Sequence, residues 1–117
     1  MVKYVSANIG LIKTNLYNAM QESHLKRLDT NRTGVLGYKL HIGLGWFTTN
    51  TNFNNDAIIW DNSIFNGYNS FIGFNPIKQR GIVILCSSIQ PNLTLISQIG
   101  FGRFDNLSTL VWNILNE

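Results

Sequence analysis

The feature that most restricts the fold is a series of apolar, strand-like segments between residues 57 and 86, separated by short polar stretches. The segments Ala57–Trp60, Asn69–Phe74 and Arg80–Cys86 are rich in β-branched and aromatic residues, which favour β-strands. The intervening "NPIKQ" (Asn75–Gln79) predicts a hairpin turn, because Pro76 fixes φ at the first central position. Strands joined by such short connections pair antiparallel, so we expect an antiparallel sheet.

Upstream, "YKLHIGLGWFTT" (Tyr38–Thr49) predicts one further strand, because Leu40, Ile42, Leu44 and Trp46 occupy alternate positions. Gly43 and Gly45 fall between them and indicate that another segment packs closely there. The polar "DNSIFNG" that follows Trp60 is expected to be a loop, a common place for catalytic groups.

Helices are expected at both ends of this strand block. Apolar residues at helical spacing predict a helix over Ser6–Met20 with Ser6 as its N-cap, although Gly10 weakens it. Gln21–Leu36 is polar and is expected to form a short helical turn and a loop. A final amphipathic helix is predicted after an N-cap at Asp105, with Trp112 near the edge of its apolar face. Residues 1–117 are thus expected to form a single α+β domain, an antiparallel sheet of about four strands with the N-terminal and C-terminal helices on one face.

Charge and cysteine content limit the possible partners. Charged residues are 13% of the chain and the net charge is +3, with the basic residues scattered, which argues against a nucleic-acid partner. Cys86 is the only cysteine, so no internal disulfide can form. No apolar run approaches the ~20 residues of a membrane span, and no signal peptide is recognisable, so the compartment stays open. His24 and His41 are the only histidines and are too few for a clustered metal site, and no cofactor is expected.

Two stretches carry a resemblance to a known family. "IGLGW" (Ile42–Trp46) is similar to a Y-G-L-G-W strand, and Ile58–Ser88 is similar to a W-H-N-G-G block that continues to G-V-V-V-L. The two stretches thus resemble the C-terminal part of the serine β-lactamase and penicillin-binding-protein superfamily, on the class C β-lactamase, D-aminopeptidase and esterase branch. Val5–Met20 resembles the helix that precedes these strands there. The resemblance implies a partial β-lactamase-like fold.

The resemblance also implies where catalytic groups would lie. The superfamily's third motif, K-T-G or H-x-G, aligns with Asp61, Asn62 and Ser63, so an acidic residue stands where Lys or His supplies positive charge or relays a proton. The superfamily's nucleophile lies in an S-x-x-K motif far upstream of the matched strands. The one literal match here, "SHLK" (Ser23–Lys26), follows the first predicted helix instead.

Three functions stay open from the sequence. The first is a β-lactamase-like C-terminal fragment that is not catalytically competent alone, and that pairs with an N-terminal partner chain or forms a homo-oligomer. The second is a weak serine hydrolase in which Ser23 with Lys26, or Ser63, is the nucleophile and His41 or Lys39 the base. The third is an unrelated α+β binding module. The sequence establishes no catalytic residue, and we expect no metal ligand.

Overall fold

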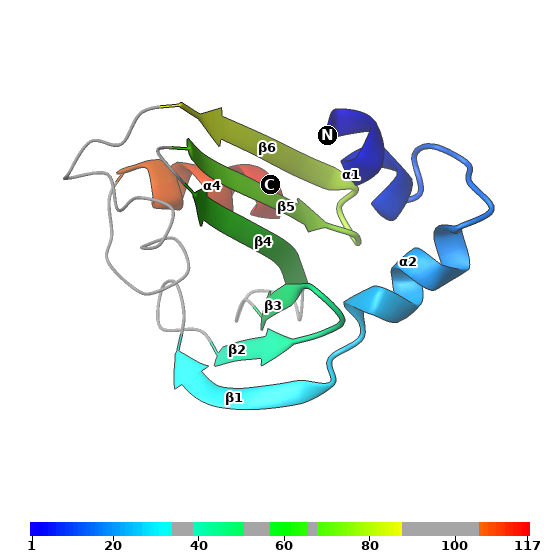
Figure 1. Ribbon diagram of the computed structural model, residues 1–117, viewed down its shortest axis with the longest axis horizontal. Helices are drawn as coiled ribbons and strands as arrows, with labels where there is room; N and C mark the ends of the chain where they lie inside the picture. The colour runs from blue at the N-terminus through cyan, green and yellow to red at the C-terminus, as the bar shows by residue number, and fades with distance from the viewer. Residues whose placement is uncertain (34–38, 51–56, 66–67, 88–105) are drawn as a thin grey trace.

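The computed structural model describes residues 1–33, 39–50, 57–65, 68–87 and 106–117 (Figure 1). In this part of the chain a six-stranded antiparallel sheet has the order β1-β2-β3-β4-β5-β6, so each strand pairs with the next along the chain. The strands are β1 (Leu28–Thr33), β2 (Lys39–Ile42), β3 (Phe47–Asn50), β4 (Ala57–Phe65), β5 (Tyr68–Asn75) and β6 (Arg80–Cys86). The helices are α1 (Val2–Asn8), α2 (Tyr17–His24) and α4 (Asn106–Asn116). The predicted α+β class and antiparallel sheet are confirmed.

The prediction of about four strands was too low. The polar segment expected to be helical turn and loop contains β1, which pairs with β2 and carries a register shift between Asp29 and Thr33. The single strand expected over Tyr38–Thr49 is two strands, because the chain reverses where the Gly43 N–H donates to the Trp46 carbonyl at 2.8 Å. Gly45 lies inside this turn at φ +74°, a conformation that favours glycine.

The expected loop after Trp60 is also wrong. β4 continues through Asp61 to Phe65, and its residues pair in unbroken register with β5. The polar residues of "DNS" therefore hydrogen-bond in a sheet ladder rather than forming a turn, because the facing strand supplies regular partners. The predicted turn at Asn75–Gln79 is confirmed: the Asn75 Oδ1 accepts from the backbone N–H groups of Ile77 and Lys78, each at 3.1 Å.

The helix predicted over Ser6–Met20 is two short helices. α1 ends because Gly10 takes φ +81°, and a Schellman motif closes its last turn. In that motif the Leu11 N–H donates to the Ser6 carbonyl at 2.8 Å and the Gly10 N–H to the Ala7 carbonyl at 3.2 Å. Ser6 is consequently inside α1 and is not its N-cap.

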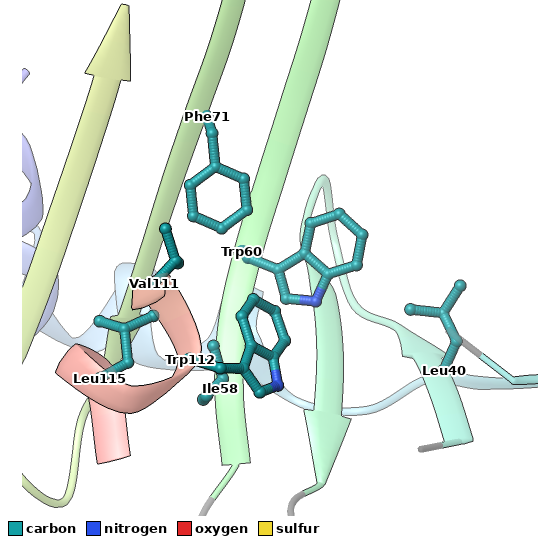
Figure 2. Close-up of a cluster of buried hydrophobic side chains, with 7 residues drawn as sticks. All are labelled: Leu40, Ile58, Trp60, Phe71, Val111, Trp112 and Leu115. Atoms are coloured by element: carbon teal, nitrogen blue, oxygen red, sulfur yellow. The ribbon is translucent and has the colours of Figure 1, made fainter. Parts of the chain in front are cut away.

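The helices do not share one face of the sheet, which corrects the predicted arrangement. One apolar cluster joins Val111, Trp112 and Leu115 of α4 to Ile58 and Trp60 of β4, with Leu40 and Phe71 (Figure 2). Side chains alternate along a strand, so Ile59 points to the opposite face. There it joins the second cluster, made of Val5, Ile9, Trp46, Ile59, Ile72 and Phe74. α1 and α4 therefore pack on opposite faces of β5 and β6, and these faces are called the α1 face and the α4 face.

The final helix begins, among the described residues, at Asn106, and the predicted N-cap Asp105 lies outside them. Val111 and Leu115 are fully buried, as their spacing predicted. Trp112 is 2% exposed and lies inside the cluster rather than at its edge, because it packs edge-on against Trp60 with ring centroids 6.5 Å apart.

Candidate functional site

The residues aligned with the superfamily's third motif lie in the middle and second half of β4. Asp61, Asn62 and Ser63 face Ile72, Phe71 and Ser70 of β5. By strand alternation Asp61 and Ser63 lie on the α1 face, and Asn62 lies on the α4 face. Ser63 is exposed, and Asp61 and Asn62 are half-buried.

Asp61 borders a small hollow at the β2–β3 turn. The hollow has a volume of about 290 Å³ and is lined by Ile42, Gly45, Trp46, Phe47 and Asp61. Burial raises the pKa of Asp61, and a hydrogen bond with the Asn62 backbone acts in the opposite direction. A carboxyl group beside two aromatic rings can accept hydrogen bonds or hold a proton. It cannot provide the positive charge that Lys or His would place beside a nucleophile.

The literal S-x-x-K match does not have the geometry of a nucleophile–base pair on one helix. The Ser23 Oγ donates to the Met20 carbonyl at 2.7 Å. α2 ends at His24, and Leu25 is extended at φ −61° and ψ 136°, so Lys26 leaves the helical path and is exposed. Ser23 and Lys26 therefore do not occupy successive turns of one helix.

The candidate bases lie on β2. Lys39 is exposed, and His41 is half-buried with its Nδ1 at 3.9 Å from Asp29 Oδ1 of β1. His41 pairs with Thr48 of β3, and Thr48 pairs with Ile59 of β4. His41 therefore lies on the α1 face, level with Ile59 and two residues along β4 from Asp61. Among the described residues, no side-chain hydrogen bond joins these bases to Ser23 or Ser63, so the structure supplies no support for a nucleophile–base pair.

A buried polar cluster centred on His24 was missed by the sequence analysis. The His24 Nε2 lies 2.8 Å from Asn8 Oδ1 at the end of α1. The Asn8 Nδ2 donates to the Tyr4 carbonyl at 2.8 Å, and the Gln21 Nε2 donates to the Asn8 carbonyl at 2.9 Å. Because Asn8 Oδ1 must accept, Nε2 carries the proton, and Nδ1 is a buried acceptor with no hydrogen-bond partner among the described residues.

Aromatic rings enclose the His24 imidazole. It packs edge-on against Trp46 and Phe74, with ring centroids 5.7 Å and 5.0 Å away. Burial lowers the pKa of His24 from 6.5 to about 4, so the ring is neutral at pH 7. The cluster joins α1, α2, the β2–β3 turn and β5. It ties the two N-terminal helices to the sheet and contains no second titratable group of opposite charge that would suit catalysis.

A larger groove lies at the outer side of β6. Its volume is about 390 Å³, and its lining includes Val2, Val5 and Leu11 near α1, Gly81 and Val83 of β6, and Ile114 of α4. α1 fits closely over the start of β6, since a Cβ at Gly81 would lie 2.2 Å from Val5 Cγ1. At the other end of β6, Leu85 is 68% exposed.

Other kinds of site find no support in the described residues. In that part of the chain no three residues among His, Cys, Asp and Glu come together as metal ligands. Within the same residues, no helix has the length and apolar character needed to cross a bilayer. Comparison with models of protein families, with curated proteins and with solved structures finds no match.

Proposed function

We propose that this chain is a non-hydrolytic assembly module whose sheet is extended by a β-strand from another polypeptide, added along β6. The observation that carries the proposal is the contrast between the two outer strands of the sheet, β1 and β6 (Figure 1). An outer strand presents unpaired backbone groups that can template a further strand, and proteins usually block it with charges, proline or a bulge.

β1 carries such protection. It contains Asp29 and Arg32, which are both exposed, and its pairing with β2 is interrupted by a register shift. Asn31 within it has φ +53°, which bends the strand out of the extended conformation. A strand that is charged, bent and irregular pairs poorly with a further strand.

β6 has no charged residue, proline or bulge between its two end residues. Gly81 to Leu85 is uncharged and free of proline, and β6 is in regular register with β5 from Arg80 to Cys86. No described residue pairs with its outer edge. A straight, apolar outer strand of this length is suited to main-chain pairing with an added strand.

The resemblance to the C-terminal part of the serine β-lactamase superfamily supports the non-hydrolytic half of the proposal. In that superfamily the nucleophile comes from a segment far upstream of the matched strands. Here the third-motif position holds Asp61, and Ser23 and Lys26 do not share a helix. Among the described residues, no contact between a serine and a basic side chain favours the alternative of a serine hydrolase.

Strand addition is tested with a fluorescent peptide that copies residues 80–87 with Cys86→Ser, flanked by lysines for solubility. We expect saturable binding measured by anisotropy, and slower amide hydrogen exchange in β6 but not in β1. A control peptide that also carries Val83→Pro and Ile84→Pro should not bind, because one of two successive N–H groups must point at β6 and proline cannot donate to a sheet ladder. Absence of binding at protein concentrations where the chain is a monomer, or equal slowing in β1 and β6, would contradict strand addition.

The absence of hydrolysis is tested separately. The purified chain is incubated with a chromogenic cephalosporin and a chromogenic ester, and its intact mass is then measured. We expect neither turnover nor a mass increase. Turnover that is lost in Ser23→Ala or Ser63→Ala, or an acyl adduct on either serine, would show that the chain carries its own nucleophile.

A further inference from the structure

The exposed features of β6 are arranged symmetrically about its centre. Gly81 and Leu85 lie two residues before and two residues after Val83, and all three share one face of the strand. That face is the α1 face, because Val83 packs against the cluster that contains Val5. α1 covers the Gly81 end and forms the groove there, whereas Leu85 projects from the uncovered end.

A second copy of the chain would complement this arrangement. If two β6 strands pair antiparallel with Val83 opposite Val83, Leu85 of each copy lies opposite Gly81 of the other. The exposed Leu85 side chain then meets the groove beside the other copy's Gly81, where Val2 and Leu11 are 71% and 57% exposed. Each copy provides the same projection and the same groove, which is the self-complementarity that a two-fold interface requires.

Charge and helix positions permit the same pairing. Arg80 is the only charged residue of β6, and it is held by Glu117 at 3.2 Å. In this register the two Arg80 residues are six positions apart, roughly 20 Å, so they do not repel at close range. Each α1 packs at the Gly81 end of its own β6, so the two helices lie at opposite ends of the shared pair of strands.

We propose that the added strand is β6 of a second copy, paired antiparallel about Val83, so that two six-stranded sheets join into one and each Leu85 fills the groove of the other copy. This inference rests on the proposed strand addition and specifies its partner. A single edge pairing buries little surface alone, and the two Leu85–groove contacts would supply the apolar area that holds the copies together.

The register is tested by a disulfide in the full chain. The variant Val83→Cys with Cys86→Ser carries one thiol on the proposed two-fold axis, where antiparallel Cα atoms lie about 4.5–5.5 Å apart, within disulfide range. We expect mild oxidation to convert most of the protein to a covalent dimer, detected by non-reducing electrophoresis and intact mass. The control Ile77→Cys with Cys86→Ser places a thiol at a site in the β5–β6 turn that is 68% exposed, more exposed than the half-buried Val83, and it should stay mostly monomeric.

The contribution of Leu85 is tested by light scattering over a concentration series. We expect the wild-type chain to reach twice its monomer mass and Leu85→Lys to weaken dimerisation at least tenfold. Ile77→Lys, which changes a residue of the same exposure away from β6, should dimerise like the wild type. A wild-type monomer that still binds the β6 peptide would overturn the second copy and leave strand addition standing. A monomer that binds no peptide would overturn both. A dimer that is unaffected by Leu85→Lys and forms no Val83→Cys disulfide would place the interface elsewhere.

Discussion

Protonation of His24 should weaken the fold in mild acid. The folded state lowers the pKa of this imidazole from 6.5 to about 4, because burial disfavours the charged form. The unfolded chain therefore binds the proton more readily than the folded chain. The contribution of neutral His24 is complete above pH 6.5, declines as the pH falls from 6.5 towards 4, and levels off below that. The gap between the two pKa values corresponds to about 3 kcal/mol in the free energy of unfolding.

Urea unfolding followed by tryptophan fluorescence measures this effect. A His41→Gln background leaves His24 as the only histidine. Between roughly pH 7.5 and roughly pH 4.5 we expect this protein to lose about 2–3 kcal/mol more than the same protein with His24→Gln. Carboxyl groups, including Asp61, titrate in both proteins and cancel in the difference.

Two further results bear on the same reasoning. An NMR titration of the folded protein should place the His24 midpoint near 4. Asn8→Asp puts a carboxylate about 2.8 Å from Nε2 and should raise that midpoint well above its value in the unmodified protein, because the carboxylate stabilises the imidazolium. If unfolding has the same pH dependence with and without His24, the argument from burial is wrong. It is also wrong if the His24 midpoint of the protein with Asn8 lies near 6.5.

The remaining predictions concern packing. Gly81→Ala should lower the free energy of unfolding by about 1–3 kcal/mol, because the new methyl group would collide with Val5, and adding Val5→Ala should recover part of the loss in urea unfolding. Leu115→Ala, at a fully buried site, should lower it by about 2–5 kcal/mol, and an unchanged midpoint would show that α4 does not stay docked. Thr49→Val removes the acceptor of the Trp60 Nε1–H at 3.0 Å and should lower the free energy of unfolding by about 1–3 kcal/mol, with a shift in tryptophan emission as a second readout.

The strand block was predictable from sequence to the extent that local signals agreed with the tertiary structure. β6 is a run of branched residues after a proline turn, and both features are visible without the fold. β1 ("LDTNRT") has no apolar alternation, so only its pairing with β2 makes it a strand. The split between α1 and α2 was missed because apolar periodicity continues past Gly10, while the Schellman motif ends the helix there.

The candidate sites also divide into features with a local sequence signal and features that depend on tertiary contacts. Alignment of a motif was enough to select Asp61, but its place in a strand depended on the partner residues of β5. His24 carries no sequence signal for burial, because its surroundings come from three segments that are distant from it along the chain. The groove at β6 likewise depends on tertiary structure, because α1 and α4 both flank β6 and neither helix is next to it in the sequence.

The order of the sheet has a consequence for how the chain folds. Every strand pairs with its neighbour in sequence, so the six strands can form by successive local hairpins, which is kinetically favourable. α1 is different, because its partners come much later: the Gln79 Nε2 donates to the Ile9 carbonyl across 70 positions of the chain. During synthesis α1 leaves the ribosome before any strand, yet it can dock only after β5 and β6 have emerged. The apolar side chains of Val5 and Ile9 therefore gain their core contacts late, and until then they are exposed and can contact other chains.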